Sequence, residues 1–254
     1  MRIIIFDTET VNLTKCFTYN VGWVIYDTDT AEVLDRQDIV IEQVWHNLPL
    51  FETAYYAEKR PLYVSAMKGK RAKMMKFGHA MRKLGKAIAD FEVTCGYAYN
   101  SPFDEKVFAF NCDWFKVGNP FDTIPVYDIR GLVHQAVAFT EDYQAFCDEH
   151  GFYTETGNYS TTAEIVYRYL KSDTEFIEAH TALSDAEIET EILNAIVANT
   201  ELEYGKPYKV YNSVPKRGKA LLVSDRRSKE EIFSREYSKI KMVKDSSGVT
   251  VILD

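Results

Sequence analysis

The sequence has little of what marks membrane-spanning or disulfide-stabilised proteins. No apolar run in its 254 residues approaches the ~18 residues that a bilayer span needs, and the early run at residues 3–6 ends at Asp7. It contains only four cysteines and no C-x-x-C pair, so neither a zinc knuckle nor a disulfide framework is indicated. We therefore expect a protein without a membrane segment that resides in the cytoplasm.

Charge is distributed unevenly along the chain. The net charge of −8 argues against a protein that coats nucleic acid by electrostatics alone. However, residues 59–86 contain ten Lys or Arg and no acidic residue, and residues 205–244 contain twelve against four acidic residues. An acidic body with basic arms suits a metal site and a phosphate-bearing ligand, although solvated helical or loop faces would give the same pattern.

Aromatic residues accompany both basic segments. Tyr63 and Phe77 lie in the first, and Tyr208, Tyr211 and Tyr237 lie in the second. Such side chains stack on the bases of single-stranded nucleic acid in some proteins and pack in the core in others. We expect at least half of them to pack in the core.

Hydrophobic patterns predict a mixed α/β fold. Five strands are expected, at residues 2–6, 21–26, 33–42, 91–99 and 125–129. Helices are expected after residue 101 and at residues 131–139, 161–170 and 185–197. Strands that first follow one another as hairpins and then alternate with helices describe a mixed five-stranded sheet with helices on its faces.

The first basic segment belongs to a stretch with helical spacing. Met67, Met74, Met81 and Ile88 recur every seven residues, so an apolar stripe is expected behind a cationic face. Three glycines in the same stretch weaken a continuous helix and favour two shorter ones.

The chain is expected to consist of a main domain and an appendage. The main domain covers residues 1–200 and includes the basic helical insertion at about residues 51–90. After about residue 199 the sequence becomes rich in Tyr, Lys and Ser, so residues 201–254 are expected to form a small basic C-terminal appendage.

Two carboxylates follow the first strand. Asp7 and Glu9 are two residues apart, so the alternation of a strand directs both side chains to one side. Carboxylates held close together repel each other unless a cation lies between them, and hard divalent cations prefer carboxylate oxygens. Turn or cap chemistry would explain the same residues without a metal.

A further acid, Asp104, follows the strand expected at residues 91–99. It lies in the run Asn100-Ser101-Pro102-Phe103-Asp104, at the entry to a helix. Ser101 and Pro102 also fit a helix cap, so Asp104 by itself has both a structural and a functional interpretation.

A histidine and an acid accompany the last expected helix. Ser184 and Glu187 have the spacing of a capping box, which would place Asp185 in the first turn of the helix and His180 in the preceding loop. Because the loop is not bound to helical spacing, both side chains can point to one site.

Together the three motifs resemble a known family. Phe6-Asp7-Thr8-Glu9-Thr10, Asn100-x-x-Phe103-Asp104 and His180-x-Ala182-Leu183-x-Asp185-Ala186 occur in this order. They resemble the DEDDh 3'-5' exonucleases, a family that includes epsilon-like proofreading exonucleases of bacterial DNA polymerases, ribonuclease T and oligoribonuclease. The resemblance covers roughly residues 1 to 200, and the spacing from His180 to Asp185 selects the histidine branch.

The resemblance implies a fold, a metal site and a reaction. It implies a ribonuclease H-like sheet and two Mg²⁺ or Mn²⁺ ions held by Asp7, Glu9, Asp104 and Asp185. His180 would take a proton from the attacking water. The activity would be 3'-5' hydrolysis of single-stranded nucleic acid, with DNA slightly preferred over RNA, releasing nucleoside 5'-monophosphates.

The resemblance also suggests how substrate is bound. Main-chain groups around Thr8 and the side chain of Asn100 would contact the terminal nucleotide, and Leu13 or Phe103 would pack against its base or sugar. The partner would be single-stranded DNA or RNA with a free 3' end, and a polymerase or other replication protein is a further candidate partner. Two alternatives remain open: an exoribonuclease of the ribonuclease T or oligoribonuclease type, and a non-catalytic polymerase-accessory module that binds nucleic acid.

Overall fold

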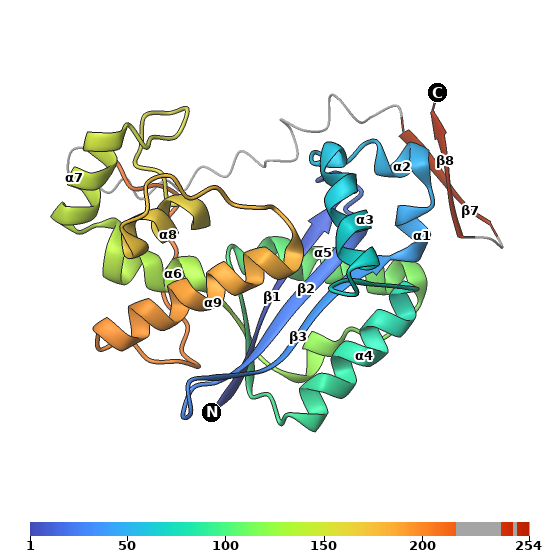
Figure 1. Ribbon diagram of the computed structural model, residues 1–254, viewed down its shortest axis with the longest axis horizontal. Helices are drawn as coiled ribbons and strands as arrows, with labels where there is room; N and C mark the ends of the chain where they lie inside the picture. The colour runs from blue at the N-terminus through green and yellow to red at the C-terminus, as the bar shows by residue number, and fades with distance from the viewer. Residues whose placement is uncertain (217–239, 246–247, 254) are drawn as a thin grey trace.

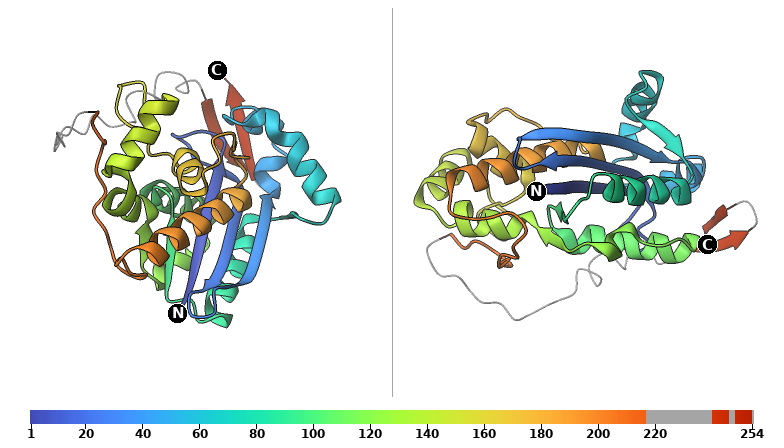
Figure 2. Two further views of the ribbon diagram at one scale, coloured as in Figure 1. Left: turned by 60° about the vertical axis from the view of Figure 1, so that its left-hand side comes forward. Right: turned by 90° about the horizontal axis from the view of Figure 1, so that it is seen from below.

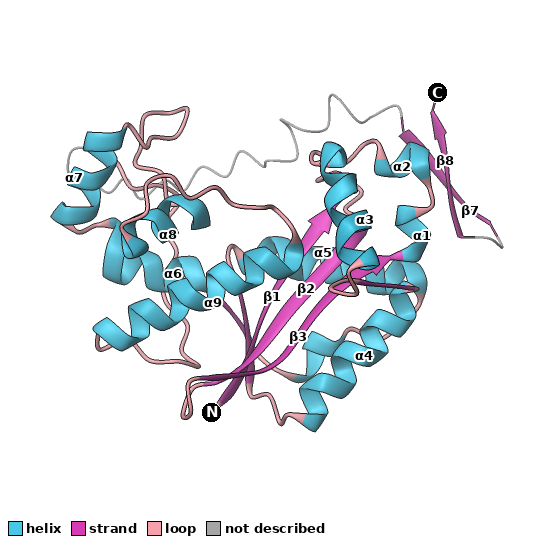
Figure 3. Ribbon diagram, viewed as in Figure 1, coloured by secondary structure: helices cyan, strands magenta, loops and turns pink. Residues whose placement is uncertain are grey.

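The computed structural model describes residues 1–216, 240–245 and 248–253. A mixed sheet with the strand order β4-β3-β2-β1-β5-β6 lies at the centre of the molecule, and helices cover it (Figure 1, Figure 3). The predicted mixed α/β class is confirmed. The predicted number of five strands is wrong, because this sheet has six.

The first three strands are antiparallel neighbours and the others join them in parallel. They are β1 (Arg2–Thr10), β2 (Thr18–Asp27), β3 (Glu32–Ile41), β4 (Lys73–Met75), β5 (Cys95–Ala98) and β6 (Val126–Asp128). β5 pairs in parallel with both β1 and β6, and β4 pairs in parallel with β3. The additional strand is β4, which has three residues and lies in a stretch with helical spacing. Periodicity over so short a segment does not distinguish a strand from a helix.

Helical segments connect the strands and follow the sheet. They are α1 (Glu42–Trp45), α2 (Leu48–Phe51), the 3-10 turn η1 (Ala57–Lys59), α3 (Arg60–Lys68), α4 (Phe77–Asp90), α5 (Ser101–Phe115), the 3-10 turn η2 (Pro120–Thr123), α6 (Ile129–Val133), the π-helical turn η3 (His134–Ala138), α7 (Glu141–His150), α8 (Ala163–Lys171) and α9 (Ala182–Asn199). The predicted basic insertion therefore contains β4 between α3 and α4, in addition to helices.

Alternate residues of β1 face two separate hydrophobic cores. Ile4 and Phe6 pack in the core that includes α4 and α5, whereas Ile3 and Ile5 pack in the core that includes α6 and α9. In Figure 1, α9 crosses in front of the strands and α5 lies behind them; Figure 2 shows the sheet from two further sides. The alternation along β1 directs Asp7 toward the face that α9 covers.

The start of α9 lies unusually close to β2. Gly22 pairs with Asp7 of β1, and a Cβ atom at Gly22 would lie 2.1 Å from the backbone nitrogen of Leu183. Nearby, the buried Asn20 side chain accepts a hydrogen bond at 2.9 Å from the backbone nitrogen of Ala182. The sheet thus binds the first turn of α9 and places it beside β1.

This arrangement corrects the predicted helix cap. The helix begins at Ala182 and its N-cap residue is Thr181, so Ser184 lies inside the helix and does not cap it. The Thr181 side chain makes no capping hydrogen bond. Asn20, a residue of β2, supplies the acceptor for the Ala182 N–H instead. A partner from a distant strand leaves no local sequence signal, which explains the wrong assignment.

Two of the five aromatic residues of the basic segments are buried, in line with the core packing expected for at least half of them. Tyr63 and Phe77 are both at most 1% exposed and belong to the core around α3 and α4. The backbone after α3 turns through Lys70, which has a left-handed φ of 59°, and this turn divides the expected apolar stripe into two helices.

The chain after α9 packs back against the core. The Gly205 N–H donates to the Tyr97 hydroxyl, and the Tyr211 N–H donates to Nδ1 of His134 at 3.0 Å. Val214 is buried and its carbonyl accepts from the Tyr159 N–H. Further along, β7 (Ile240–Asp245) and β8 (Gly248–Leu253) form an antiparallel pair. The rest of the predicted appendage, including Tyr237, lies outside the described residues.

Within the described part of the chain, no helix combines the length and the apolar character required to cross a membrane.

Candidate active site

Three carboxylates from two elements converge. Asp7 and Glu9 project from β1, and Asp185 projects from the first turn of α9. Each offers one oxygen, and these three oxygens lie within 4.8 Å of one another. Among the described residues, Oδ1 of Asp185 is buried and has no hydrogen-bond partner. The first turn of α9 packs directly against the backbone of Gly22, and this close packing places Asp185 beside β1.

Asp104 reaches the same region from the other face of the sheet. β5 pairs only with residues 3–5 of β1, so the edge of β1 beyond Phe6 is open where α5 begins. Asp104 is 2% exposed, and its Oδ1 accepts a hydrogen bond at 2.6 Å from Oγ1 of Thr8. Asp104 does not contribute to the group of three close oxygens. Burial and then the charge of the neighbouring Asp7 raise its pKa.

The structure does not support the alternative interpretation of Asp104 as part of a helix cap. α5 begins at Ser101, after the N-cap residue Asn100, and the Ser101 hydroxyl donates to Oε1 of Glu105. The N-cap residue makes no side-chain capping hydrogen bond, and Ser101 does not form a capping pair with Asp104. Its carboxylate is bound by Thr8, which orients it from β1.

Burial raises the pKa of all four predicted acids, Asp7, Glu9, Asp104 and Asp185. Burial raises the pKa of Asp7 to about 7, assisted by the Glu178 carboxylate, and raises the pKa of Asp185 to about 10, assisted by Asp7. Burial and the Asp7 charge raise the pKa of Glu9 and of Asp104 well above the ordinary range. In the absence of a cation, this cluster favours bound protons. A divalent cation would replace those protons and stabilise the ionised form.

A further buried acid, Glu189, was missed by the sequence reasoning. It lies one helical turn after Asp185, is 3% exposed and accepts a hydrogen bond from the Tyr99 N–H at 3.1 Å. Burial and Asp7 raise its pKa well above the ordinary value. The spacing of four residues from Asp185 places it on the same helix face and is the signal that could have found it.

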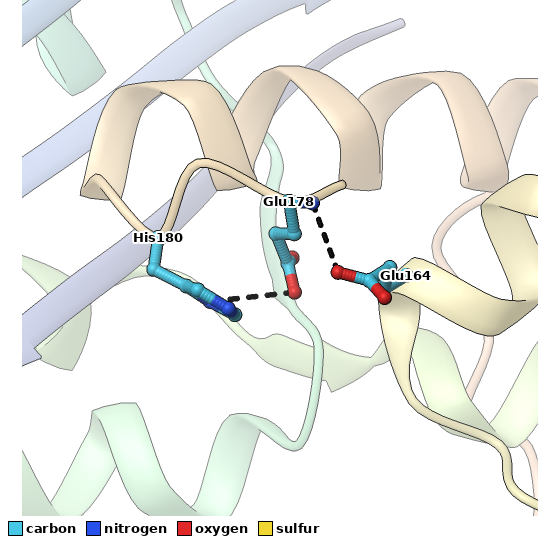
Figure 4. A group of neighbouring side chains, drawn as sticks. All are labelled: Glu164, Glu178 and His180. Carbon is cyan, nitrogen blue, oxygen red and sulfur yellow. Dashed lines mark hydrogen bonds and ion pairs between the residues drawn. The ribbon is translucent and has the colours of Figure 1, made fainter. Parts of the chain in front are cut away.

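His180 lies in the loop before α9, as predicted. Its ring stacks on Tyr56, with centroids 4.4 Å apart and planes inclined by 11°. Its Nδ1 lies 3.5 Å from Oε2 of Glu178 (Figure 4). Burial and the Lys59 ammonium lower the pKa of His180, so the neutral ring is favoured at neutral pH.

Glu178 is a second acid that the sequence reasoning missed. Its backbone N–H donates to Oε2 of Glu164 at 2.9 Å (Figure 4). Oε1 of Glu164 forms an ion pair with Arg168 at 2.8 Å. Glu164, Glu178 and His180 could hold a cation by distance alone. Since both oxygens of Glu164 are already bonded to protein groups, the geometry favours a supporting chain behind His180.

Of the residues predicted to contact substrate, Thr8 has a direct contact with a site carboxylate. Thr8 is buried and binds Asp104, while Leu13 is 38% exposed in the loop after β1. Asn100 has a left-handed φ of 71°, and its Oδ1 accepts from Arg130 at 3.0 Å. Phe103 is partly buried in the first turn of α5.

Comparisons with known proteins show where this fold occurs. No protein-family model and no curated protein matches the sequence. The structure is similar to that of Escherichia coli Exonuclease I in complex with a dA16 oligonucleotide, with a TM-score of 0.53 and 16% identity over 79% of this chain and 41% of that chain. It is similarly close to Exonuclease I of Methylocaldum szegediense, with a TM-score of 0.52 and 16% identity over the same shares.

The chain has the ribonuclease H-like fold of these structures. This confirms the predicted fold class. The chain spans about two fifths of the length of the Exonuclease I structures that it matches.

Proposed function

We propose that this protein is a metal-dependent 3'-5' exonuclease that hydrolyses single-stranded nucleic acid, preferably DNA, and releases nucleoside 5'-monophosphates. The observation that carries this proposal is the convergence of Asp7, Glu9 and Asp185, whose oxygens lie within 4.8 Å of one another. Oxygens of three acids gathered in a mostly buried place, with one of them lacking a hydrogen-bond partner among the described residues, fit a divalent cation.

The residues present therefore fit the metal that the proposed activity requires. Asp7, Glu9 and Asp185 would hold it, with Asp104 beside them, and Mg²⁺ or Mn²⁺ is the cation that suits an all-oxygen donor set. When bound, a pair of such ions supplies activation of a water and stabilisation of the departing 3'-oxygen.

The protein's own groups have separate tasks. Thr8 fixes the orientation of the Asp104 carboxylate through its hydroxyl. His180, whose lowered pKa favours the neutral ring, would accept the proton of the attacking water. Leu13, Phe103, Asn100 and the main chain at Thr8 are the proposed contacts to the terminal nucleotide.

The choice of DNA as preferred substrate is supported by the structural neighbours. Escherichia coli Exonuclease I was solved with a dA16 oligonucleotide, and Exonuclease I was also solved with SSB-Ct. These two structures name an oligonucleotide and SSB-Ct, and neither names a polymerase. We accordingly propose single-stranded DNA with a free 3' end as the partner of this chain.

The first prediction tests the activity itself. Incubation with Mg²⁺ and matched single-stranded DNA and RNA, each labelled at the 5' end, should shorten the DNA stepwise from the 3' end. Asp7→Asn and Asp185→Asn should each reduce the rate by at least about 100-fold, because each removes a metal ligand and the metal carries the chemistry.

The controls of this assay separate the alternatives. EDTA should stop the reaction, and Asp29→Asn, which changes an exposed acid in the turn between β2 and β3, should leave it unchanged. Faster degradation of RNA would favour the exoribonuclease. Binding of DNA without degradation in any divalent metal would favour the non-catalytic module and contradict the proposal.

A further inference from the structure

We propose that Glu178 is a positioning residue for His180, and that Tyr56 holds the same ring from its face. This inference rests on the proposed nuclease function, because it assigns how the proton-accepting histidine is oriented. Three sets of contacts carry it: the backbone of His180, the face of its ring and its Nδ1 edge.

The backbone of His180 requires support from its surroundings. Its φ is 51°, in the left-handed region that residues with a Cβ atom adopt at an energetic cost. The preceding carbonyl, that of Ala179, accepts a hydrogen bond at 2.8 Å from Nζ of Lys59. Lys59 belongs to η1, which is 120 residues away in the chain. A contact over this separation ties the insertion to the loop that carries His180.

The ring plane of His180 is set by the same part of the chain. Tyr56 precedes η1 and stacks on the imidazole nearly in parallel, at 4.4 Å between centroids. Nζ of Lys59 also lies 4.4 Å from the centre of the Tyr56 ring. The Tyr56 ring thus contacts both the Lys59 ammonium and the imidazole of His180, and this stacking restricts rotation of the imidazole.

The Nδ1 edge of His180 faces Glu178. Oε2 of Glu178 lies 3.5 Å from Nδ1, and the Glu178 side chain is only 12% exposed (Figure 4). This distance exceeds that of a strong hydrogen bond, and contacts of catalytic groups commonly shorten when substrate binds. An acceptor at Nδ1 selects the tautomer that carries its proton there, so that Nε2 has a free lone pair to accept the proton of water.

Glu178 is itself anchored to α8. Its N–H donates to Oε2 of Glu164, and Glu164 pairs with Arg168 one helical turn later. The order Arg168, Glu164, Glu178, His180 is therefore a continuous chain of polar contacts from a helix to the proposed proton acceptor. Each member lies outside the three close carboxylates of Asp7, Glu9 and Asp185.

The decisive experiment compares Glu178→Ala with a matched control. Glu175→Gln changes an exposed acid of the same loop and should retain the wild-type kcat. Glu178→Ala should lower kcat by about 10- to 100-fold, the usual effect of removing a group that orients a functional histidine, with KM changed by less than about threefold. Glu178→Gln, which keeps an oxygen acceptor, should lose less.

A spectroscopic readout tests the same inference without activity. ¹⁵N NMR of the His180 ring should show the Nδ1–H tautomer in the wild type and in Glu175→Gln. Glu178→Ala should shift the ring toward a mixture with the Nε2–H tautomer. Folding of each variant is checked by comparing its far-UV circular dichroism with that of the wild type.

Tyr56 supplies a second pair of variants. Tyr56→Ala should lower kcat, and Tyr56→Phe, which retains the stacked ring, should restore most of it. Tyr55 is unsuitable as the control, because its ring packs against that of Tyr56 at 4.8 Å between centroids. Leu48→Ala is the control instead, because Leu48 is a 50% exposed apolar residue of α2, and it should retain the wild-type kcat.

The outcomes separate this inference from the proposed function. An active wild type with unchanged kcat and an unchanged His180 tautomer in Glu178→Ala would overturn the positioning role and leave the nuclease intact. Loss of Mn²⁺ binding in Glu178→Gln would overturn it in favour of a metal ligand. An inactive wild type would defeat the nuclease proposal, while the tautomer measurement would still support or reject the placement of the imidazole by Glu178.

Discussion

Asp185 illustrates how a single side chain of this protein is held in an unfavourable state. The residue is only 6% exposed, and Oδ1 of its carboxylate has no hydrogen-bond partner among the described residues. The carboxylate of Asp7 lies next to it. Burial and that neighbouring charge raise its pKa to about 10. The folded, metal-free protein therefore binds a proton that the unfolded chain releases near its ordinary pKa of 3.8.

The raised pKa of Asp185 makes the stability of the metal-free protein decrease as the pH rises. Because the folded state binds the proton more tightly, the associated stability is complete below about pH 4 and is lost as the pH rises toward about 10. In EDTA, the Tm of the wild type should fall between about pH 6 and about pH 9 more steeply than that of Asp185→Asn, which has no charge to bury. Thermal unfolding at both pH values measures this difference.

A second measurement follows the change in Tm when a divalent metal is added. Added Mg²⁺ should raise the Tm of the wild type more at the higher pH, where the protons have left the carboxylates, and should raise that of Asp185→Asn much less. Equal stabilisation of the two proteins would show that Asp185 does not hold the ion.

At the scale of secondary structure, the seat of α9 on the sheet determines the geometry of the site. β1 supplies Asp7 and Glu9, and α9 supplies Asp185, so the site depends on the distance between these elements. Gly22 permits that distance, since a side chain there would meet the backbone of Ala182 and Leu183. Asn20 completes the contact by binding the first free N–H of the helix.

Gly22→Ala is therefore expected to damage both stability and activity. The added Cβ would lie 2.1 Å from the Leu183 nitrogen, so α9 must move away from β2. We expect the free energy of unfolding to fall by about 1–3 kcal/mol or more, as for other overpacked sites, together with a loss of exonuclease rate. Urea unfolding and the labelled-strand assay measure the two effects.

Gly118→Ala is the matched control for this substitution. A Cβ at Gly118 would meet no atom within 4 Å, so neither stability nor rate should change appreciably. If Gly22→Ala retained full activity, the close approach of α9 would not be required for the site.

At the scale of the whole molecule, positive charge lies next to an acidic site. A groove of about 560 Å³ runs beside the loop that carries His180, and the arginines Arg36 and Arg71 line it together with the acids Asp38 and Glu187. Arg36 forms an ion pair with Glu187 at 3.2 Å. Under the proposed function, these arginines would attract the phosphates of a strand while the nearby acids hold the metal.

Arg71→Gln should weaken binding of single-stranded DNA at low salt. If Arg71 contacts one phosphate, the slope of log affinity against log salt should become shallower by about 1. Fluorescence anisotropy over a salt series measures the slope. Lys86→Gln is the control, because Lys86 pairs with Asp90 at the end of α4, and its slope should equal that of the wild type.

Elements with a regular local pattern were predictable from the sequence. A very short strand, and a helix end that is held by a distant residue, were not. The sequence shows directly the apolar run that begins β1, the strand-like segments of β2 and β3 and the helical spacing of α8 and α9. β4 was missed because three residues carry too little periodicity. The cap of α9 was misassigned because its acceptor, Asn20, is 162 residues away from the N–H that it binds.

The sequence by itself determined the mixed α/β class, because the residue patterns typical of strands and helices are local properties of the chain. It indicated Asp7, Glu9, Asp104, His180 and Asp185. Only the tertiary structure decided that Asp185 meets β1 through the space left by Gly22, and that Glu178 and Tyr56 face His180. Gly22 and Tyr56 meet residues that are distant in the chain, and the contact of Glu178 with His180 depends on the left-handed backbone at His180. Such contacts form only when burial and packing assemble the whole domain.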